Sequence, residues 1–340
     1  MYLSDVLDAV VIECARVVFI TSSCPLFKLW FVSATSANPD MTSSSTTERN
    51  TEMVNPRVII VTGANRGIGR AICDKILSKP NLGPIKLFAT SRQGDDLSIK
   101  PHSADQKILY PKLDVSIQDS IRDFGAEVQK QHGPVSVLVN NAGVNLDQPA
   151  KNYGPENAKR TLDINFRGTV QMCQTFLPQL HDGGRIVNLS SVASGINIYS
   201  PEVQQRLRGA TSLQELEQIA QEFEHSVRTS TEASSGFHST QRSYNLSKAL
   251  LRAATRILAS QNPQHLINCC CPGWIDTDMG GQISSRGTRP PKTAEEGARI
   301  PVRLALDDIG GVTGEHWAND SVRSRDEGKV MRDWEEGSSS

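Results

Sequence analysis

The chain has 340 residues, enough for two domains of average size or for one large α/β domain with tails. Its 36 basic (Lys and Arg) and 37 acidic residues leave a formal net charge of −1, which excludes the basic surface that nucleic acids require. With 38% hydrophobic residues and no uncharged apolar stretch of about 18 residues, neither wholesale disorder nor an integral membrane protein is expected.

Seven cysteines, an odd number without a Cys-x-x-Cys pair, fit neither a disulfide framework nor a zinc site. We therefore expect reduced thiols, a cytoplasmic location and no metal. Three cysteines, Cys269 to Cys271, are consecutive and would alternate faces on a strand, so we interpret them as small buried residues. The alternative is that Cys271, next to Pro272, carries a reactive thiol near a cofactor.

The two ends of the chain differ from its centre. In residues 1–54 an apolar stretch interrupted by charges leads into a Ser/Thr-rich segment, and the longest uncharged run is only Val17–Phe27. We expect this extension to be disordered, or the chain to begin at Met41 with the preceding segment not normally translated. The alternative is that the segment is a weak membrane tether. Residues 333–340 are polar and are expected to form a disordered tail, which leaves one domain at 55–332.

Between these ends, short apolar segments alternate with helical patterns, as in repeated βαβ units around a parallel sheet. Strands are predicted at Arg57–Thr62, Lys86–Thr90, Lys107–Leu113, Val135–Asn140, Arg185–Leu189 and Leu266–Cys271. Helices are predicted at Arg66–Ser78, Ser116–His132, Glu156–Leu180 and Tyr244–Ser260. The strands lack polar alternation, as expected when helices cover both faces. The predicted fold class is therefore α/β, with a doubly wound parallel sheet (Rossmann fold).

A glycine-rich turn follows the first strand directly, with the sequence Thr62-Gly63-Ala64-Asn65-Arg66-Gly67-Ile68-Gly69. An apolar helical pattern follows it, so the turn opens a helix whose unpaired N–H groups attract a pyrophosphate. The missing Cβ atoms of the three glycines would leave room for it. This segment resembles the short-chain dehydrogenase/reductase family, whose members carry Thr-Gly-x-x-x-Gly-x-Gly at this place.

Three further motifs carry the same resemblance, which runs from about Pro56 to Gly314. It implies that Asp114 and Val115 bind the adenine, that Asn140-Asn141-Ala142-Gly143 shapes the sheet centre and contacts the ribose, and that Pro272–Thr277 lines the nicotinamide. The predicted cofactor-binding residues are Gly63, Asn65, Arg66, Gly67, Ile68, Gly69, Arg92, Asp114, Val115, Asn141, Ala142, Gly143, Tyr244, Lys248, Pro272, Gly273 and Thr277.

The residues that discriminate between NAD and NADP are expected at the end of the second strand. A carboxylate there binds the ribose hydroxyls of NAD, whereas cations bind the 2′-phosphate of NADP. This strand leads directly into Ser91 and Arg92, no carboxylate follows before Asp95, and Arg66 lies in the glycine turn. Two guanidiniums favour NADP(H). The alternative, in which Arg92 is only a solvated loop residue, would allow an NAD-linked enzyme.

Carbonyl reduction needs a proton donor and a hydrogen-bond donor at the carbonyl oxygen. Tyr244 and Lys248 are four residues apart and share one face of a helix. Lowering the pKa of a tyrosine from about 10 to near 7 takes roughly 4 kcal/mol, which one unit charge at about 4 Å supplies at an effective dielectric near 20. We therefore expect Lys248 to lower the pKa of Tyr244.

The resemblance implies two more catalytic residues. Ser191, rather than Ser190, would orient the substrate carbonyl, because the family's serine directly precedes the Val192-Ala193-Ser194 turn. Asn165 would hold a water that connects Lys248 to solvent, or else be a satisfied polar residue in a helix kink. The predicted catalytic set is Asn165, Ser191, Tyr244 and Lys248.

The separation of 53 residues between Ser191 and Tyr244 is far longer than in most relatives. It predicts a helical insertion at about 199–241, with a capping box starting at Ser212 and an amphipathic helix after it. An insertion here resembles the carbonyl reductase branch of the family, whose members are typically monomeric. The expected function is NADPH-dependent reduction of ketones, aldehydes or quinones, with an NADP(H)-binding redox sensor or scaffold and an NAD-linked alcohol dehydrogenase as alternatives.

Overall fold

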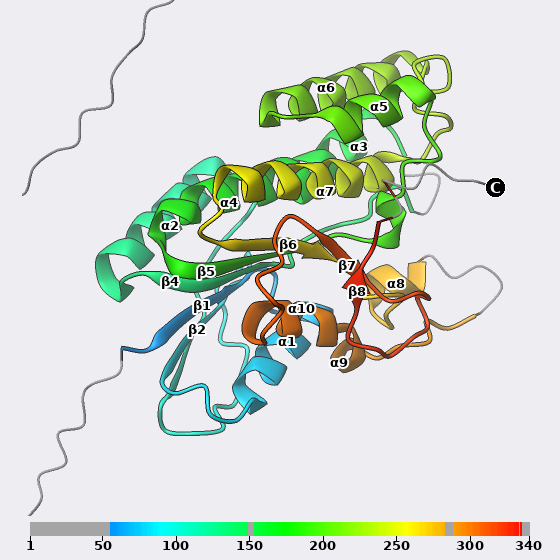
Figure 1. Ribbon diagram of the computed structural model, residues 1–340. Helices are drawn as coiled ribbons and strands as arrows, with labels where there is room; N and C mark the ends of the chain where they lie inside the picture. The colour runs from blue at the N-terminus through cyan, green and yellow to red at the C-terminus, as the bar shows by residue number, and fades with distance from the viewer. Residues whose placement is uncertain (1–54, 149–152, 283–287, 333, 335–340) are drawn as a thin grey trace, which may run out of the picture. The chain divides into compact units, whose positions relative to one another are not determined.

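The computed structural model describes residues 55–148, 153–282, 288–332 and 334 (Figure 1). The expected N-terminal extension, residues 1–54, lies outside this part of the chain, and so does the expected tail apart from Trp334. No helix within these ranges is both long enough and apolar enough to cross a membrane.

The described residues form one eight-stranded sheet in the order β3-β2-β1-β4-β5-β6-β7-β8. Every neighbouring pair is parallel except β7 with β8. The strands are β1 (Arg57–Val61), β2 (Ile85–Ala89), β3 (Gln106–Leu109), β4 (Val135–Asn140), β5 (Leu180–Leu189), β6 (Leu266–Cys270), β7 (His316–Ala318) and β8 (Lys329–Val330). The strand order reverses between β1 and β4, which leaves a crevice at their carboxyl ends. The predicted doubly wound α/β fold is confirmed.

All six predicted strands are present, although β3 ends at Leu109 instead of Leu113. Pro111 lies two residues further on and cannot donate a ladder hydrogen bond, so the pairing continues only as an isolated bridge between Ser91 and Lys112. The two remaining strands, β7 and β8, were not predicted. With three and two residues they are too short to show an alternating pattern.

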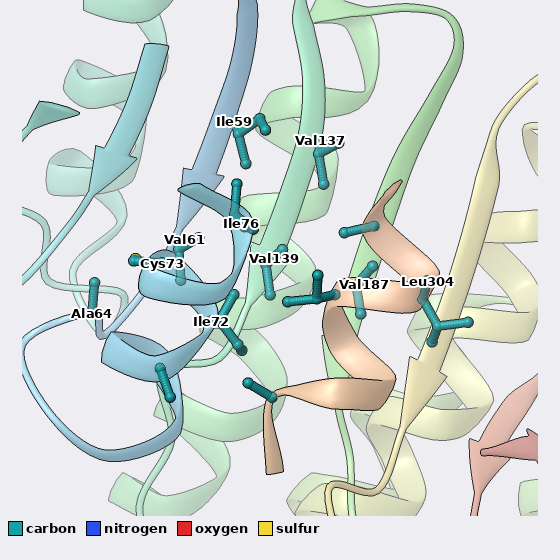
Figure 2. Close-up of a cluster of buried hydrophobic side chains, with 14 of the residues drawn as sticks. Ile59, Val61, Ala64, Ile72, Cys73, Ile76, Val137, Val139, Val187 and Leu304 are labelled. Carbon is teal, nitrogen blue, oxygen red and sulfur yellow. The ribbon is translucent and has the colours of Figure 1, made fainter. Parts of the chain in front are cut away.

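The side chains of β1 explain why the strands are apolar throughout. Ile59 and Val61 belong to one buried cluster, whereas Val58 and Ile60 belong to another on the opposite face. Figure 2 shows the first cluster, with Ile72 of α1 close to the strands. Helices therefore cover both faces of the sheet: α1, α9 and α10 on one side, and α2, α4 and α7 on the other (Figure 1).

The helices that flank the sheet come from all parts of the described chain. They are α1 (Gly67–Ser78), α2 (Gln118–His132), α3 (Pro155–Leu162), α4 (Thr169–Phe176), α7 (Ser243–Gln261), α8 (Asp278–Gln282), α9 (Ala294–Gly297) and α10 (Arg299–Leu306). The last three were not predicted as helices. They have four to eight residues, and α10 contains Pro301, which hides its helical pattern.

The prediction of one helix at Glu156–Leu180 is wrong. The segment consists of α3, a π-helical turn η2 (Asp163–Gly168), α4 and a 3₁₀ turn η3 (Leu177–Gln179), and Leu180 begins β5. A Cβ atom on Gly168 would lie 2.1 Å from the carbonyl oxygen of Val115, so the helix approaches this loop more closely than another residue would allow. The π-helical turn occurs at this contact and carries Asn165.

The region of the predicted insertion forms two helices, α5 (Pro201–Gly209) and α6 (Leu213–Thr229). Only the second was predicted. Ser212 caps it by accepting the N–H of Glu215, but the Glu215 carboxylate accepts the N–H of Thr211 instead of completing a capping box with Ser212. Phe223 and Phe237 are buried where α6 packs on α3 and α7, away from the sheet (Figure 1).

The consecutive cysteines are buried and free, as predicted. Cys269 and Cys270 lie in β6, and Cys271 follows it with 3% of its surface exposed. Burial raises the pKa of the Cys271 thiol, although Lys248 and Lys292 oppose the rise. The alternative of a reactive Cys271 thiol is therefore not supported.

Candidate active site

Two adjoining cavities lie at the carboxyl ends of the strands. The large cavity has a volume of about 1100 Å³ and the small cavity about 650 Å³. Six residues line both of them, which places these residues at the boundary: Ile68, Ser190, Tyr244, Pro272, Thr277 and Met279.

The large cavity brings together sixteen of the seventeen predicted cofactor residues. Gly273 is the exception, because it lines the small cavity. The other sixteen are Gly63, Asn65, Arg66, Gly67, Ile68, Gly69, Arg92, Asp114, Val115, Asn141, Ala142, Gly143, Tyr244, Lys248, Pro272 and Thr277.

The glycines of the first turn are required mainly by contacts within the protein. Gly63 and Gly67 have φ of 65° and 54°, a region that L side chains rarely adopt. A Cβ atom on Gly69 would lie 2.3 Å from the carbonyl oxygen of Gly63. The expectation that all three glycines clear a path for phosphate is therefore too simple, because Gly69 permits the helix to pack against its own turn.

Hydrogen bonds join this turn to the loop after β4. The Thr62 hydroxyl accepts the N–H groups of Asn141 and Ala142, each at 3.0 Å. The Asn141 side chain in turn donates to the carbonyl oxygens of Thr62 at 2.8 Å and Gly63 at 3.1 Å. Two motifs that lie far apart in the sequence thus form one rigid wall of the large cavity.

The helix start and its cations suit an anionic ligand. Arg66 is the N-cap residue of α1 and makes no side-chain capping hydrogen bond, so N–H groups of the first turn remain for a ligand. Its guanidinium pairs with the exposed Asp278 at 2.7 Å. Arg92 is exposed at the wall of the same cavity, as is Asp95. Asp114 accepts hydrogen bonds from the N–H and the hydroxyl of Ser116 with one carboxylate oxygen.

Tyr244 and Lys248 lie one turn apart in α7, as predicted. The Lys248 ammonium is 5.7 Å from the centroid of the Tyr244 ring and donates to the carbonyl oxygen of Leu189 at 2.7 Å. Burial lowers the pKa of Lys248 to about 8.

The expectation that Lys248 lowers the pKa of Tyr244 below its ordinary value is wrong. Burial raises the pKa of Tyr244 to about 12, although a hydrogen bond with Ser191 acts in the opposite direction. The expectation counted the charge of Lys248 and omitted desolvation, which dominates here. The ammonium is also bound to a backbone carbonyl and not to the phenol.

The two candidate serines have different surroundings. The Ser190 hydroxyl is buried and donates to the carbonyl oxygen of Lys248 at 3.2 Å. Ser191 lines the small cavity, accepts the N–H of Ala193 at 3.1 Å at the start of the 3₁₀ turn η4 (Val192–Ser194), and acts to lower the pKa of Tyr244. Ser191 is therefore the serine placed beside the phenol.

The Asn165 side chain joins the loop after β4 to α7. It accepts the N–H of Val144 and donates to the carbonyl oxygen of the same residue, both at 2.8 Å. It also donates to the Ser247 hydroxyl at 3.0 Å. Both amide hydrogens are used, so the side chain is a satisfied polar residue at a helix kink, which was the alternative to its water-holding role.

Two residues at the site carry no local sequence signal. Asp147 accepts the N–H of Tyr244 across a separation of 97 residues. The Trp334 indole is buried and donates to the carbonyl oxygen of Ser194 at 3.1 Å, with the Arg252 guanidinium 4.5 Å from its centroid. The prediction of a disordered tail is therefore wrong at Trp334. Only a pattern of contacts between distant segments could have revealed either residue.

Comparisons with known proteins agree with this geometry. Residues 57–201 match the family model described as short chain dehydrogenase. The chain is 32% identical over 260 residues to carbonyl reductase (NADPH) 1 of Oryctolagus cuniculus, covering 74% of this chain and 91% of the relative. It is also 32% identical over 281 residues to (+)-neomenthol dehydrogenase of Arabidopsis thaliana, covering 74% and 92%. The structure of salutaridine reductase from Papaver somniferum has a TM-score of 0.64 and 25% identity, covering 78% of this chain and 99% of that one.

These relatives are matched over nearly their whole length, and the residues that match the family model contain the glycine turn. Members of the family are oxidoreductases that bind a nicotinamide cofactor. The chain belongs to the short-chain dehydrogenase/reductase family, in a carbonyl reductase-like branch.

Proposed function

We propose that this protein is an NADPH-dependent carbonyl reductase in which Tyr244 is the general acid. The observation that supports this most strongly is the position of Tyr244 in the lining of both cavities, with Ser191 in the lining of the small one. A carbonyl group between a cofactor in the large cavity and a substrate body in the small cavity would meet both hydroxyls there. Such a pair supplies the proton donor and the hydrogen-bond donor that carbonyl reduction needs.

The large cavity suits NADP(H). The uncapped N–H groups at the start of α1 would hold the pyrophosphate, and Arg66 and Arg92 would bind the 2′-phosphate. When bound, the reduced nicotinamide supplies the hydride for the carbonyl carbon. The relative from Oryctolagus cuniculus carries NADPH in its name, which favours the same cofactor for this chain.

The proton step follows from the two hydroxyls. Ser191 would hold the carbonyl oxygen while negative charge develops on it, and Tyr244 would donate its proton to that oxygen. A phenol whose pKa is raised to about 12 keeps its proton at neutral pH. An alkoxide is a stronger base than a phenolate, so proton transfer from Tyr244 to the alkoxide is favourable in the direction of reduction.

Lys248 and Asn165 would support this proton transfer without contacting the substrate oxygen. With a pKa of about 8, Lys248 is a cation at neutral pH and would stabilise the phenolate left on Tyr244. Its contact with the Leu189 carbonyl fixes the ammonium where it would also bind the nicotinamide ribose. The Asn165 side chain holds the neighbouring loop against α7.

The small cavity favours carbonyl compounds with an apolar body, such as ketones, aldehydes and quinones. Trp274 and Met279 lie in its lining, and the Trp274 indole is held by a hydrogen bond to the carbonyl oxygen of Gly280 at 3.0 Å. Ala193 leaves space beside Ser191 that a larger residue would fill.

The substitution Tyr244→Phe tests the proposal. It removes the proton donor and keeps the ring, so we expect kcat to fall by about 10²- to 10⁴-fold while NADPH affinity stays within about twofold. NADPH consumption should be measured for both proteins with a panel of quinones, aldehydes and ketones. Near-normal reduction by the variant would reject the role of Tyr244, and NADPH binding by a wild type that reduces nothing in the panel would favour a redox sensor or scaffold.

The substitution Arg92→Ala tests the cofactor. Because a hydrogen bond to a charged group is worth about 1.5–3 kcal/mol, NADPH affinity should fall by roughly 10- to 100-fold while NADH affinity is unchanged. Arg122→Ala is the control, since Arg122 is exposed on α2 and pairs with Asp119. Equal affinity of the wild type for NADH and NADPH would instead favour an NAD-linked alcohol dehydrogenase.

We further propose that residues 55–332 act as a single, monomeric, cytoplasmic domain. The insertion packs on α3 and α7 and covers helix surface that another copy would otherwise contact. The buried, unpaired cysteines of the described residues fit a reducing compartment. Sedimentation analysis tests the oligomeric state, because a dimer at micromolar concentration would contradict it.

A further inference from the structure

The helix that carries Tyr244 and Lys248 lacks a cap of its own. Arg242 is the N-cap residue of α7 and makes no side-chain capping hydrogen bond, and the first turn contains no acidic residue. The first N–H groups of a helix have no partner within the helix, so a buried helix start needs an acceptor from elsewhere. A negatively charged acceptor would also interact favourably with the helix dipole.

Asp147 supplies this acceptor from the loop after β4. One carboxylate oxygen accepts the backbone N–H of Tyr244 at 2.9 Å. Only 3% of the Asp147 surface is exposed, and burial raises the pKa of its carboxyl group. The positive charge of Arg242 and contacts with Ser243 oppose this rise, so the helix start itself favours the ionised form.

The loop that carries Asp147 is held at a second point. Asn165 makes two hydrogen bonds to the backbone of Val144, three residues before Asp147. The loop is thus fixed at one point through η2 and at the other through the start of α7. Asp147 also lines the small cavity, as does Tyr244.

We propose that Asp147 is a positioning residue, which caps α7 from outside the helix and thereby fixes the Tyr244 phenol relative to Ser191. This inference rests on the proposed function, because its consequence is measured as carbonyl reduction. The bonded N–H belongs to Tyr244 itself, so any shift of this turn moves the phenol directly. A misplacement of about 1 Å at a reacting group can lower the rate about 100-fold.

Three substitutions at this position separate the role of the acceptor from the role of charge. Asp147→Ala removes the acceptor, Asp147→Asn keeps an acceptor oxygen without the charge, and Asp147→Glu keeps the charge but displaces it by one methylene. We expect Asp147→Ala to lower kcat roughly 10- to 100-fold, with NADPH affinity within about twofold of wild type. Asp147→Asn should retain kcat within about threefold, and Asp147→Glu should be intermediate.

The matched control is Ser212→Ala, which removes a helix cap in the insertion, away from Tyr244. Both Ala variants lose one cap, so both should lower the melting temperature by about 2–4 °C. Only Asp147→Ala should lower kcat, and this difference distinguishes a positioning role from a general loss of stability. kcat, KM and NADPH affinity are measured for all four variants with the best substrate of the panel.

Unchanged kcat in Asp147→Ala would overturn the inference. An Asn variant as impaired as the Ala variant would also overturn it, because the charge and not the hydrogen bond would then matter. If Asp147→Ala does not fold, the comparison between Asn and Glu decides, since positioning predicts that Asn is the more active. Failure of the proposed function is distinguishable, because the wild type would then reduce no substrate at all.

Discussion

The two cavities are built in different ways. The large cavity is lined mainly by α1 and by the turns that follow β1, β2, β3, β4 and β6, and its geometry depends on glycines and backbone groups. The small cavity is lined by side chains from segments far apart in the chain, including η4, the end of the insertion, the loop after β6 and Val322. A cavity of the first kind leaves compact motifs in the sequence, whereas one of the second kind is spread over residues that show no pattern.

The largest expected effect tests whether the insertion unfolds together with the rest of the structure around the small cavity. Phe223 in α6 is fully buried against Phe237, so Phe223→Ala should lower the free energy of unfolding by about 3–5 kcal/mol. Urea unfolding followed by circular dichroism and by tryptophan fluorescence should give one coincident transition. Two separate transitions would show that the insertion unfolds by itself, and the small cavity would then be less dependent on it than we infer.

The next largest effect concerns the glycine turn in the wall of the large cavity. Gly69→Ala would place a Cβ atom 2.3 Å from the carbonyl oxygen of Gly63, which should cost about 3 kcal/mol or more and abolish NADPH binding. The control is Gly209→Ala at the end of α5, where the added Cβ meets no atom from outside its own helix within 4 Å. Calorimetric titration with NADPH distinguishes the two, and a Gly69→Ala protein that binds NADPH normally would refute a cavity built on glycine contacts.

The smallest effect concerns Lys248, which lies beside Tyr244 near the boundary between the two cavities. The pKa of Lys248 is about 8 in the folded protein and near its ordinary 10.5 in the unfolded chain. Between these values the unfolded chain binds a proton at Lys248 that the folded protein does not, so the contribution of this group to stability should rise with pH in this window, by about 2–3 kcal/mol. Burial raises the pKa of Tyr244 and of the buried cysteines, such as Cys271, and these groups oppose the rise. Lys248→Met removes only the contribution of the lysine, so the measurement is the difference in the free energy of unfolding between the wild type and this variant, from pH 8 to pH 10. A difference that does not change with pH would contradict the prediction.

The same contrast explains how much the sequence could predict. The fold and sixteen cavity residues follow from short motifs, which lie at the ends of apolar strands except for Tyr244 and Lys248 on α7, so local pattern was sufficient. Asp147 and Trp334 act through contacts with distant residues, which no local pattern reports. The π-helical turn at Asn165 was missed because it depends on the close approach of Gly168 to another loop.

The failure at Tyr244 has a different cause. The sequence alone places a charge near the phenol, because i and i+4 residues share a helix face. The desolvation of Tyr244 and the capture of the Lys248 ammonium by Leu189 depend on the packed surroundings of both side chains. The spacing of two residues along a helix therefore overstates how far a lysine acidifies its neighbour.

The contact between Trp334 and Ser194 has a consequence for how the protein is made. Ribosomes synthesise the chain from its N-terminus, so β1 to β4 and the glycine turn can associate while later segments are still being translated. The turn after Ser191 gains its hydrogen bond from the indole only when residue 334 has left the ribosome. The nascent chain can therefore complete the wall of the large cavity before it completes the serine turn.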